Sequence, residues 1–390
     1  MLTSQKDLFY LPEDVTYLNC AYMSPQMKPV DEAGLNAVVR KRLPYEIGAD
    51  DFFKDGEVFR DAFARLINVN DHNRVVIIPS VSYGLSSVAK NLKLTQGQKI
   101  IVAGEQFPSN FYPWKSAADE HGAEVETIAA PNKLEGRGEA WNNAILEAID
   151  QNTAAVCIGH VHWADGTLFD LINIRQRTKE VGALLILDGT QSVGALPFDV
   201  EAIQPDALVC GGYKWLMGPY SIGAAYFGPY FDGGKPLEEN WINRHDSHKF
   251  AELVNYQDKY LEGALRYEVG EHSNFVLLPM FIRALQQLNE WGPANIQAYS
   301  DNLTSEFCEK LIARDFWVED RAYRSTHLFG VRLPAGADMA QVKQALEDNN
   351  IYVSVRGNAI RVSTHLFNDQ QDLDKLFECL VSSVANPSMA

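Results

Sequence analysis

Short apolar runs alternate with amphipathic segments through the first half of the chain. The apolar runs predict buried parallel strands, at Val75–Ile78, Lys99–Ala103, Ala154–Ile158, Ala183–Leu187, Ala207–Cys210 and Gly223–Phe227. The amphipathic segments predict helices, at Tyr83–Leu92, Trp114–His121, Ala140–Ala148 and Leu171–Val181. Because strands and helices alternate, we expect an α/β domain with a parallel sheet.

The pattern changes after Phe227. Residues 228–262 are polar and aromatic without a clear period, which predicts a long surface excursion. Helices are predicted at Leu277–Trp291, Asn295–Arg314, Met339–Asp348 and Gln370–Val384, and strands at His327–Leu333, Ile351–Val355 and Ala359–Ser363. These elements indicate a smaller α+β C-terminal domain. We therefore expect a large domain over 15–275 and a small domain formed by 1–14 with 276–390.

Composition narrows the class of protein. The net charge of −17 argues against binding to nucleic acid or to an anionic membrane, which requires a basic face. No apolar stretch reaches the ~18 residues of a membrane-spanning helix, and the start of the chain lacks the features of a signal peptide. Five scattered cysteines form no disulfide pattern, so a cytoplasmic location is expected. No metal site is predicted.

Two polar residues stand at the ends of successive predicted strands. Asp188 ends the run LLILD, where it caps the next turn or serves as a functional anion. Lys214 follows the next strand in GGYKWLMGP, where it snorkels to the surface or is a desolvated amine with a lowered pKa. Ligands of parallel sheets bind beyond the carboxyl ends of strands. Both side chains can therefore meet one aromatic ring, as pyridoxal 5′-phosphate (PLP) requires: an anion at the pyridine nitrogen and an amine at the aldehyde.

Eight segments in order resemble a known family. They are YLNCAYMSP (17–25), PSVSYGLSSVA (79–89), EQFPSNFYPW (105–114), GHVHWADGTLFDL (159–171), LDGTQSVGALPFDV (187–200), GGYKWLMGPYSIGAAYF (211–227), RYEVG (266–270) and IRVSTHLFN (360–368). Together they resemble the class V aminotransferase group of fold-type I PLP enzymes, which includes cysteine desulfurases, isopenicillin-N-epimerase-like proteins and kynureninases. The resemblance implies the fold-type I architecture, an α/β fold whose large domain has a mostly parallel seven-stranded sheet. It also implies PLP as cofactor, a small amino-acid substrate and a homodimer with the active site between subunits.

The resemblance also implies roles around the cofactor ring. Lys214 would carry PLP as a Schiff base and move the proton at the substrate α-carbon, and Asp188 would pair with the pyridine nitrogen. Gln191 would hydrogen-bond the phenolic oxygen of the ring, and Phe107 would stack on the ring face. Trp163 falls where desulfurases have an asparagine near that oxygen, and an indole cannot accept a hydrogen bond.

The phosphate is expected where residues 79–89 turn from loop into helix, since backbone N–H groups at a helix start attract an anion. Ser82 and the Tyr83 amide are the best candidates, with the Val81 amide as a third. Without the resemblance, Ser82 would simply cap the helix. Tyr213 matches a residue that contacts the phosphate in the family.

Other implied residues concern the substrate and the second subunit. Arg361 matches the arginine that grips the substrate α-carboxylate, for which a guanidinium is the natural clamp; the alternative is a solvated arginine on an edge strand. Ser273 and Asn274 match a segment that reaches the partner's cofactor. Tyr22 is expected in the substrate pocket. His160 and His162 flank Trp163, and one of them either faces the cofactor ring or is a structural histidine. The excursion offers Arg244, His245 and His248 to the substrate pocket, with Arg244 a guess for a second carboxylate clamp.

Departures from the family pattern narrow the chemistry. No cysteine stands in NNIYVSVRGNAIRVS, where desulfurases carry their nucleophile. Kynureninases have a histidine where this chain has Gln191. The favoured function is therefore a class V aminotransferase, and the alternatives are a C–S lyase, an epimerase, a kynureninase-like hydrolase and a binding protein without catalysis. A nucleotide-dependent enzyme is disfavoured because neither glycine-rich phosphate motif follows the first strands.

Overall fold

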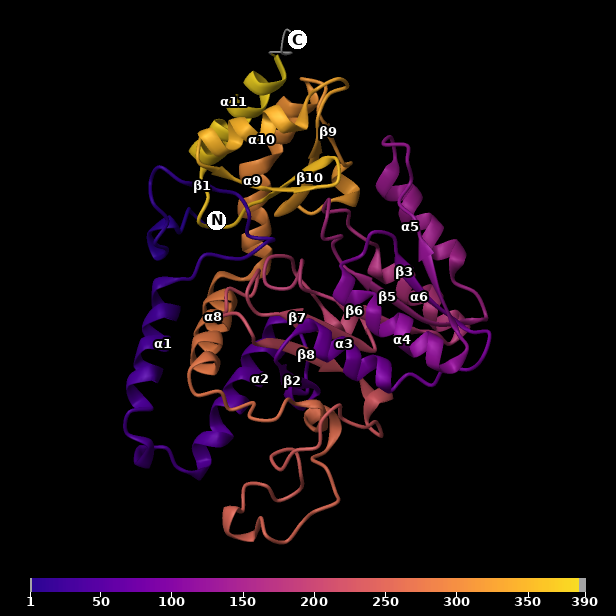
Figure 1. The fold of residues 1–390 in the computed structure, drawn as a ribbon, viewed down its shortest axis with the longest axis vertical. Coiled ribbons are helices and arrows are strands. Elements are labelled where there is room, and N and C mark those ends of the chain that lie inside the picture. Colours follow the sequence, from indigo (N-terminus) through magenta and orange to yellow (C-terminus); the bar gives the residue numbers. More distant parts are fainter. Residues whose placement is uncertain (1, 386–390) are drawn as a thin grey trace.

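The fold is built on a mixed seven-stranded sheet. A computed structural model describes residues 2–385. The sheet has the strand order β2-β8-β7-β6-β5-β3-β4 (Figure 1). The strands are β2 (Val75–Ile78), β3 (Lys99–Ala103), β4 (Glu124–Ile128), β5 (Thr153–Gly159), β6 (Leu184–Asp188), β7 (Ala207–Gly211) and β8 (Gly223–Phe227). The predicted α/β architecture is confirmed.

Two strands differ from the sequence prediction. β8 runs antiparallel to both β2 and β7, so the expectation of a parallel strand at Gly223–Phe227 is wrong. The chain returns from β7 to β8 through a loop without a crossover helix, and such a return produces antiparallel pairing. The sequence pattern also missed β4, whose residues are half exposed at the sheet edge and so form no continuous apolar run.

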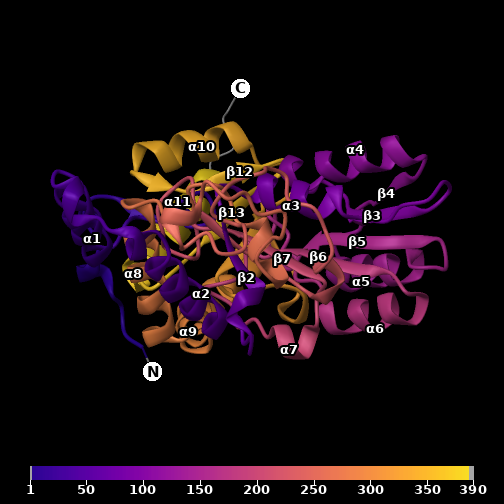
Figure 2. The same cartoon turned by 90° about the horizontal axis from the view of Figure 1, so that it is seen from below.

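Helices cover both faces of the sheet. The helices α3 (Val81–Lys90) and α4 (Tyr112–His121) pack on one face, as Figure 2 shows. The other face carries α2 (Lys54–Leu66), α5 (Arg137–Ala148), α6 (Leu171–Val181), α7 (Val200–Ile203) and α8 (Leu277–Trp291). Alternate residues of the inner strands enter opposite cores. Burial on both faces therefore accounts for the apolar runs of these strands in the sequence.

The C-terminal part is a smaller α+β unit. Its antiparallel sheet has the order β12-β13-β10-β9. The unit contains α9 (Pro293–Ile312), β9 (Trp317–Val318), β10 (Leu328–Arg332), α10 (Met339–Asp348), β12 (Ser354–Arg356), β13 (Ala359–Ser363) and α11 (Gln370–Ala385). The strand predicted at 351–355 is in fact two short strands, because β11 (Ile351–Tyr352) pairs with β1 (Thr16–Tyr17) and β12 pairs with β13.

The remaining segments lie at the periphery. The helix α1 (Lys28–Arg40) packs against α8 at one side of the molecule (Figure 1). Residues 228–262 contain only short 3-10 helices at Pro229–Phe231 and Phe250–Glu252, and they extend away from the C-terminal unit. The division at 15–275 stays a prediction, and residues 1 and 386–390 of the predicted small domain lie outside the described residues. No helix between residues 2 and 385 is long and apolar enough to cross a membrane.

Candidate active site

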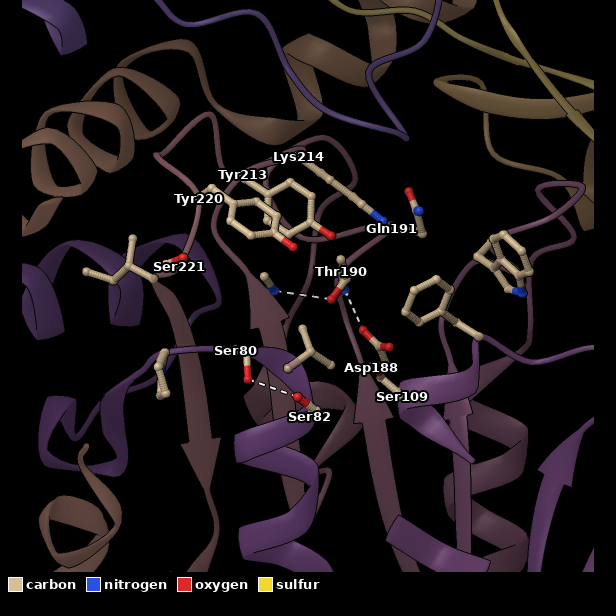
Figure 3. Close-up of a pocket in the computed structure, with 16 residues that line it drawn as sticks. Ser80, Ser82, Ser109, Asp188, Thr190, Gln191, Tyr213, Lys214, Tyr220 and Ser221 are labelled. Atoms are coloured by element: carbon tan, nitrogen blue, oxygen red, sulfur yellow. Dashed lines mark hydrogen bonds between the residues drawn. The ribbon is translucent and has the colours of Figure 1, made fainter. Parts of the chain in front are cut away.

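A pocket opens where the carboxyl ends of β6 and β7 meet the N-terminus of α3. Its volume is about 270 Å³. Figure 3 shows Lys214 and Gln191 along the upper side and Asp188 and Ser82 along the lower side. The lining residues are Pro79, Ser80, Val81, Ser82, Phe107, Ser109, Trp163, Asp188, Thr190, Gln191, Gly211, Tyr213, Lys214, Tyr220, Ser221 and Ile222. The two strand-end residues predicted from the sequence therefore do face one cavity.

Lys214 reaches this pocket from the loop after β7. Its neighbours Trp215 and Met217 are fully buried, and they anchor the loop so that Lys214 itself is only 8% exposed. Its Nζ lies 5.7 Å from the ring centroid of Phe107 and 5.5 Å from that of Tyr213. Burial, and then the positive charge of Arg361, lower the pKa of Lys214 to about 8. About a tenth of the amine is therefore neutral and nucleophilic at pH 7, far more than for a lysine with the ordinary pKa.

Asp188 occupies the end of β6, facing the same cavity. Its Oδ1 accepts a hydrogen bond of 2.9 Å from the Thr190 amide, so the carboxylate does cap the turn as well as face the pocket. Burial raises the pKa of Asp188, while Thr190 and Lys214 oppose that effect. The Thr190 hydroxyl in turn accepts a hydrogen bond of 3.1 Å from the Gly211 amide, which ties the tips of β6 and β7 together.

Gln191 is held on both sides by the protein. Its Nε2 donates to Ala21 O at 3.1 Å, and its Oε1 accepts from Trp215 Nε1 at 2.8 Å. An amide nitrogen carries two hydrogens, so one donor remains for a ligand in the pocket. The hydrogen bond from Gln191 to the phenolic oxygen of the cofactor ring stays a prediction, and the two bonds within the protein fix the orientation of the Gln191 amide.

Two aromatic rings form one wall of the pocket. The rings of Phe107 and Trp163 lie 5.3 Å apart at 78°, and Phe107 is 39% exposed. Trp163 Nε1 donates to Glu105 O at 2.7 Å. The indole N–H is thus committed to the backbone, and Trp163 contributes its ring surface rather than a polar contact.

The N-terminus of α3 corrects part of the predicted phosphate site. Ser80, not Ser82, is the N-cap: its Oγ accepts from the Tyr83 amide at 3.2 Å. That bond occupies the Tyr83 N–H, and Tyr83 does not line the pocket. Val81 and Ser82 do line it, and the Oγ atoms of Ser80 and Ser82 lie 2.9 Å apart. The first amides of a helix have no intrahelical partner, so this end of the pocket suits a phosphate.

The pocket is also lined by four polar residues that the sequence analysis did not predict. Thr190, Ser109, Tyr220 and Ser221 all line the cavity, and the ring of Tyr220 lies 4.6 Å from that of Tyr213. Ser221 and Tyr220 follow Lys214 closely in PYSIG, and their polar character at a strand-connecting loop was the available signal.

Arg361 lies on β13 and does not line the 270 Å³ pocket, but it contacts the backbone of the lining residue Trp163. It is 1% exposed, and so is not the solvated edge-strand arginine of the alternative interpretation. Its Nη1 donates to Trp163 O at 2.7 Å and its Nη2 to Ser354 Oγ at 3.3 Å, whereas its Nε is buried without a partner. Burial, and then Arg356, lower the pKa of Arg361 to about 9. A substrate carboxylate would supply the anion that this guanidinium lacks among the described residues.

Several predicted residues lie outside the pocket of this chain. Tyr22 is 56% exposed and does not line the cavity. Asn274 Oδ1 accepts from the Leu277 amide at the start of α8, and neither it nor Ser273 reaches this pocket. Arg244, the guess for a second carboxylate clamp, does not line this pocket either: its guanidinium pairs with Glu239 and lies 4.0 Å from the Tyr260 ring centroid in the excursion, and its role stays a prediction.

None of the candidate histidines, and none of the cysteines, lines the 270 Å³ pocket. His162 bonds Asp165 at 3.0 Å and Gly104 O at 3.2 Å, and His160 packs edge-on against Phe198. His245 and His248 lie in the excursion, where His245 contacts Asp246. All five cysteines are free and buried, and none lines the 270 Å³ pocket.

The donor set fits PLP. The pocket offers one amine, one carboxylate, an aromatic face and a helix start bearing hydroxyls. These groups match the aldehyde, the pyridine nitrogen, the ring and the phosphate of that cofactor.

Comparisons with known proteins agree. The model of the family described as "Aminotransferase class-V" matches residues 48–376. The chain is 24% identical to the uncharacterized aminotransferase YcbU of Bacillus subtilis over 81% of this chain and 80% of that protein. It is 23% identical to isopenicillin N epimerase of Streptomyces clavuligerus, covering 82% of each.

Solved structures show the same fold. The apo structure of a cysteine desulfurase from Thermococcus onnurineus has a TM-score of 0.84 at 20% identity, covering 99% of this chain and 100% of that one. A mutant of C-DES with glycine covalently linked to the PLP cofactor has a TM-score of 0.84 at 19% identity, covering 98% and 100%. The cofactor is pyridoxal 5′-phosphate, and the chain belongs to the class V aminotransferase family of fold-type I PLP-dependent enzymes.

Proposed function

We propose that the protein is an aminotransferase that removes the amino group of an amino acid and passes it to an oxo acid. One observation carries the proposal: the Lys214 amine and the Asp188 carboxylate face a single pocket that contains no cysteine among its lining residues. PLP supplies an electron sink for negative charge at the substrate α-carbon.

The residues of this chain divide the remaining work. Asp188 holds a negative charge at one end of the ring, and Lys214 moves the proton at the α-carbon with an amine whose pKa lies near 8. Arg361 binds the α-carboxylate, and Phe107 with Trp163 keeps water from one face. Val81 and Ser82 bind the phosphate.

C–S bond cleavage is the second candidate. The fold matches that of C-DES, described as a cystine C-S lyase, with a TM-score of 0.82. Elimination and transamination share proton removal by Lys214 and differ in which bond breaks next, so the pocket must decide between them. Persulfide transfer through an active-site cysteine is disfavoured because all five cysteines are buried and none lines the pocket.

A panel of amino acids incubated with and without an oxo-acid acceptor tests the proposal. Transamination predicts oxo-acid formation only when the acceptor is present, with no ammonia released. Oxo acid and ammonia without an acceptor would instead show elimination, inversion at the α-carbon would show an epimerase, and alanine with anthranilate from kynurenine would show a hydrolase. A protein that binds amino acids but turns over none of them would be a binding protein.

The homodimer is part of the proposal. The face of α1 and the following residues expose Leu35, Val38, Val39, Leu43 and Tyr45. Such an apolar face favours burial against another subunit, and Ser273 and Asn274 do not enter the pocket of their own chain. Light scattering at micromolar concentration should give twice the monomer mass of 43.6 kDa, and a monomeric active enzyme would contradict it.

The cytoplasmic location also stays a proposal. Five buried thiols without a disulfide suit a reducing compartment. Cell fractionation with a compartment marker would test it.

A further inference from the structure

The hairpin of β12 and β13 carries two arginines on one face. Ser354 pairs with Arg361 across the hairpin, and Arg356 lies two residues beyond Ser354. Residues directly opposite, and those two apart along a strand, share a face of the sheet. Arg356 and Arg361 therefore project together toward the large domain.

Both guanidinium groups contact Trp163. Arg361 donates to its carbonyl oxygen at 2.7 Å, and the Cζ of Arg356 lies 5.5 Å from the centroid of its indole ring. Trp163 itself lines the active-site pocket. Arg356 thus stands one aromatic ring away from the cavity that holds Lys214.

Arg356 has no counter-ion in the described part of the chain. Its Nη1 donates to Val355 O at 2.9 Å, and no carboxylate of residues 2–385 lies within ion-pair distance. Arg137 nearby does have a counter-ion, since it pairs with Asp165 at 2.8 Å, whereas Arg332 bonds the neutral amide of Asn358 and, like Arg356, forms no ion pair among residues 2–385. Arg356 is therefore a cation beside the active site whose charge the protein leaves uncompensated.

A second cavity provides room for a ligand group at Arg356. It measures about 410 Å³ and is lined by Arg356, Arg332, Glu105, Ala164 and Asn358 among others. The Trp163–Ala164 segment separates it from the 270 Å³ active-site pocket. A side chain that extends past the Trp163 ring would reach this space.

We propose that Arg356 binds a second acidic group on the substrate, so that the enzyme selects amino acids whose side chain ends in a carboxylate or a similar anion. The inference rests on the proposed function, in which Arg361 takes the α-carboxylate. Hydrogen bonds to charged groups are the stronger ones, and replacing the distal carboxylate by an amide should weaken binding about 10- to 100-fold.

The first test uses equilibrium binding. Calorimetry on the holoenzyme compares glutarate with its monoamide, which differ only in the distal charge. We expect glutarate to bind at least about 10-fold more tightly. Arg356→Gln should abolish that preference, and Arg356→Lys should retain part of it. Arg321→Gln is the matched control, because it removes the same charge from an exposed ion pair with Asp301 in the small domain.

The second test compares acidic amino acids with their amides. The readout is either the rate of turnover or the change in cofactor absorbance when the amino acid is added. The wild type should respond to glutamate or aspartate at lower concentration than to glutamine or asparagine. Arg356→Gln should reduce kcat/KM for the acidic member about 10- to 100-fold and leave the amide member nearly unchanged.

The outcomes separate this inference from the proposed function. If amino acids change the cofactor spectrum but acidic ones have no advantage, or if Arg356→Gln weakens both members equally, Arg356 is not a specificity residue and the proposed function stands. If no amino acid changes the spectrum, the proposed function fails, and the glutarate measurement still decides whether Arg356 binds an anion.

Discussion

The two walls of the active site are built in opposite ways. On the large-domain wall, Asp188, Thr190 and Gln191 each have partners that fix their orientation. The small-domain wall consists of Arg361 and Arg356, which contact Trp163 from outside the lining of the 270 Å³ pocket. Both guanidinium groups lack any carboxylate partner among the described residues. A cofactor that stays bound calls for preorganised groups, whereas a substrate that enters and leaves can supply the missing anions itself.

Removing the Lys214 amine should have the largest effect. Lys214→Ala should lower turnover about 10³-fold or more, because the cofactor attachment and the proton carrier are lost together. Steady-state rates with the best amino acid check this, and Lys179→Ala on α6 is the control. Activity within about tenfold of the wild type would show that another group moves the proton.

Neutralising the large-domain wall should come next. Asp188→Asn keeps an oxygen for the Thr190 amide but removes the charge at the ring nitrogen, so kcat should fall about 10²-fold or more while cofactor content is preserved. Activity and cofactor absorbance are measured on the same sample. Unchanged kcat would mean that the Asp188 charge has no role beyond capping the turn.

The small-domain wall should respond differently. Arg361→Gln should reduce kcat/KM about 10- to 100-fold by removing the carboxylate clamp. It should not lower the melting temperature of the apoenzyme, because the guanidinium is buried without a counter-ion and its charged state is costly there. Strong destabilisation would show that Arg361 is a structural residue, and the contrast between the two walls would be lost.

Variants of Ser80 and Ser82 distinguish the capping of α3 from the binding of the cofactor phosphate. Ser80→Ala should reduce the free energy of unfolding by about 1 kcal/mol, because the cap on Tyr83 N is lost. Ser82→Ala leaves that cap in place and should mainly weaken cofactor retention. Denaturation and dialysis against cofactor-free buffer measure the two effects. Equal losses of stability would contradict the assignment of Ser80 as the cap.

The smallest effect concerns pH. The neutral amine of Lys214 attacks the cofactor, so the rate of reconstitution of the apoenzyme should rise with pH and level off above about 8. Because Arg361 lowers the pKa of Lys214, Arg361→Gln should move the midpoint to higher pH. Stopped-flow absorbance over pH 6 to about 10 follows it. A midpoint that stays in place would show that Arg361 does not influence the pKa of Lys214.

The sequence predicted the large-domain wall better than the small-domain wall. Asp188 and Lys214 follow apolar runs, and the ends of neighbouring strands in one sheet must lie close together. Helices such as Leu277–Trp291 and Met339–Asp348 match their predicted bounds because their apolar period is unbroken.

What the sequence missed depends on contacts between distant segments. Gln191 is oriented by Ala21 and Trp215, and no local pattern encodes those bonds. The uncompensated charge of Arg356 is visible only once the hairpin register and the positions of all carboxylates are known. The sequence pattern points to Ser82 as the helix cap, whereas the structure has Ser80 there, because either serine is a suitable N-cap residue.

Chemical trapping of the lysine–cofactor bond tests the account most directly. The holoenzyme is reduced with borohydride, digested and mapped by mass spectrometry. We expect a pyridoxyl adduct on the peptide that contains Lys214 and on no other lysine. An adduct elsewhere, or an unmodified Lys214 in a protein saturated with the cofactor, would contradict the active site described above.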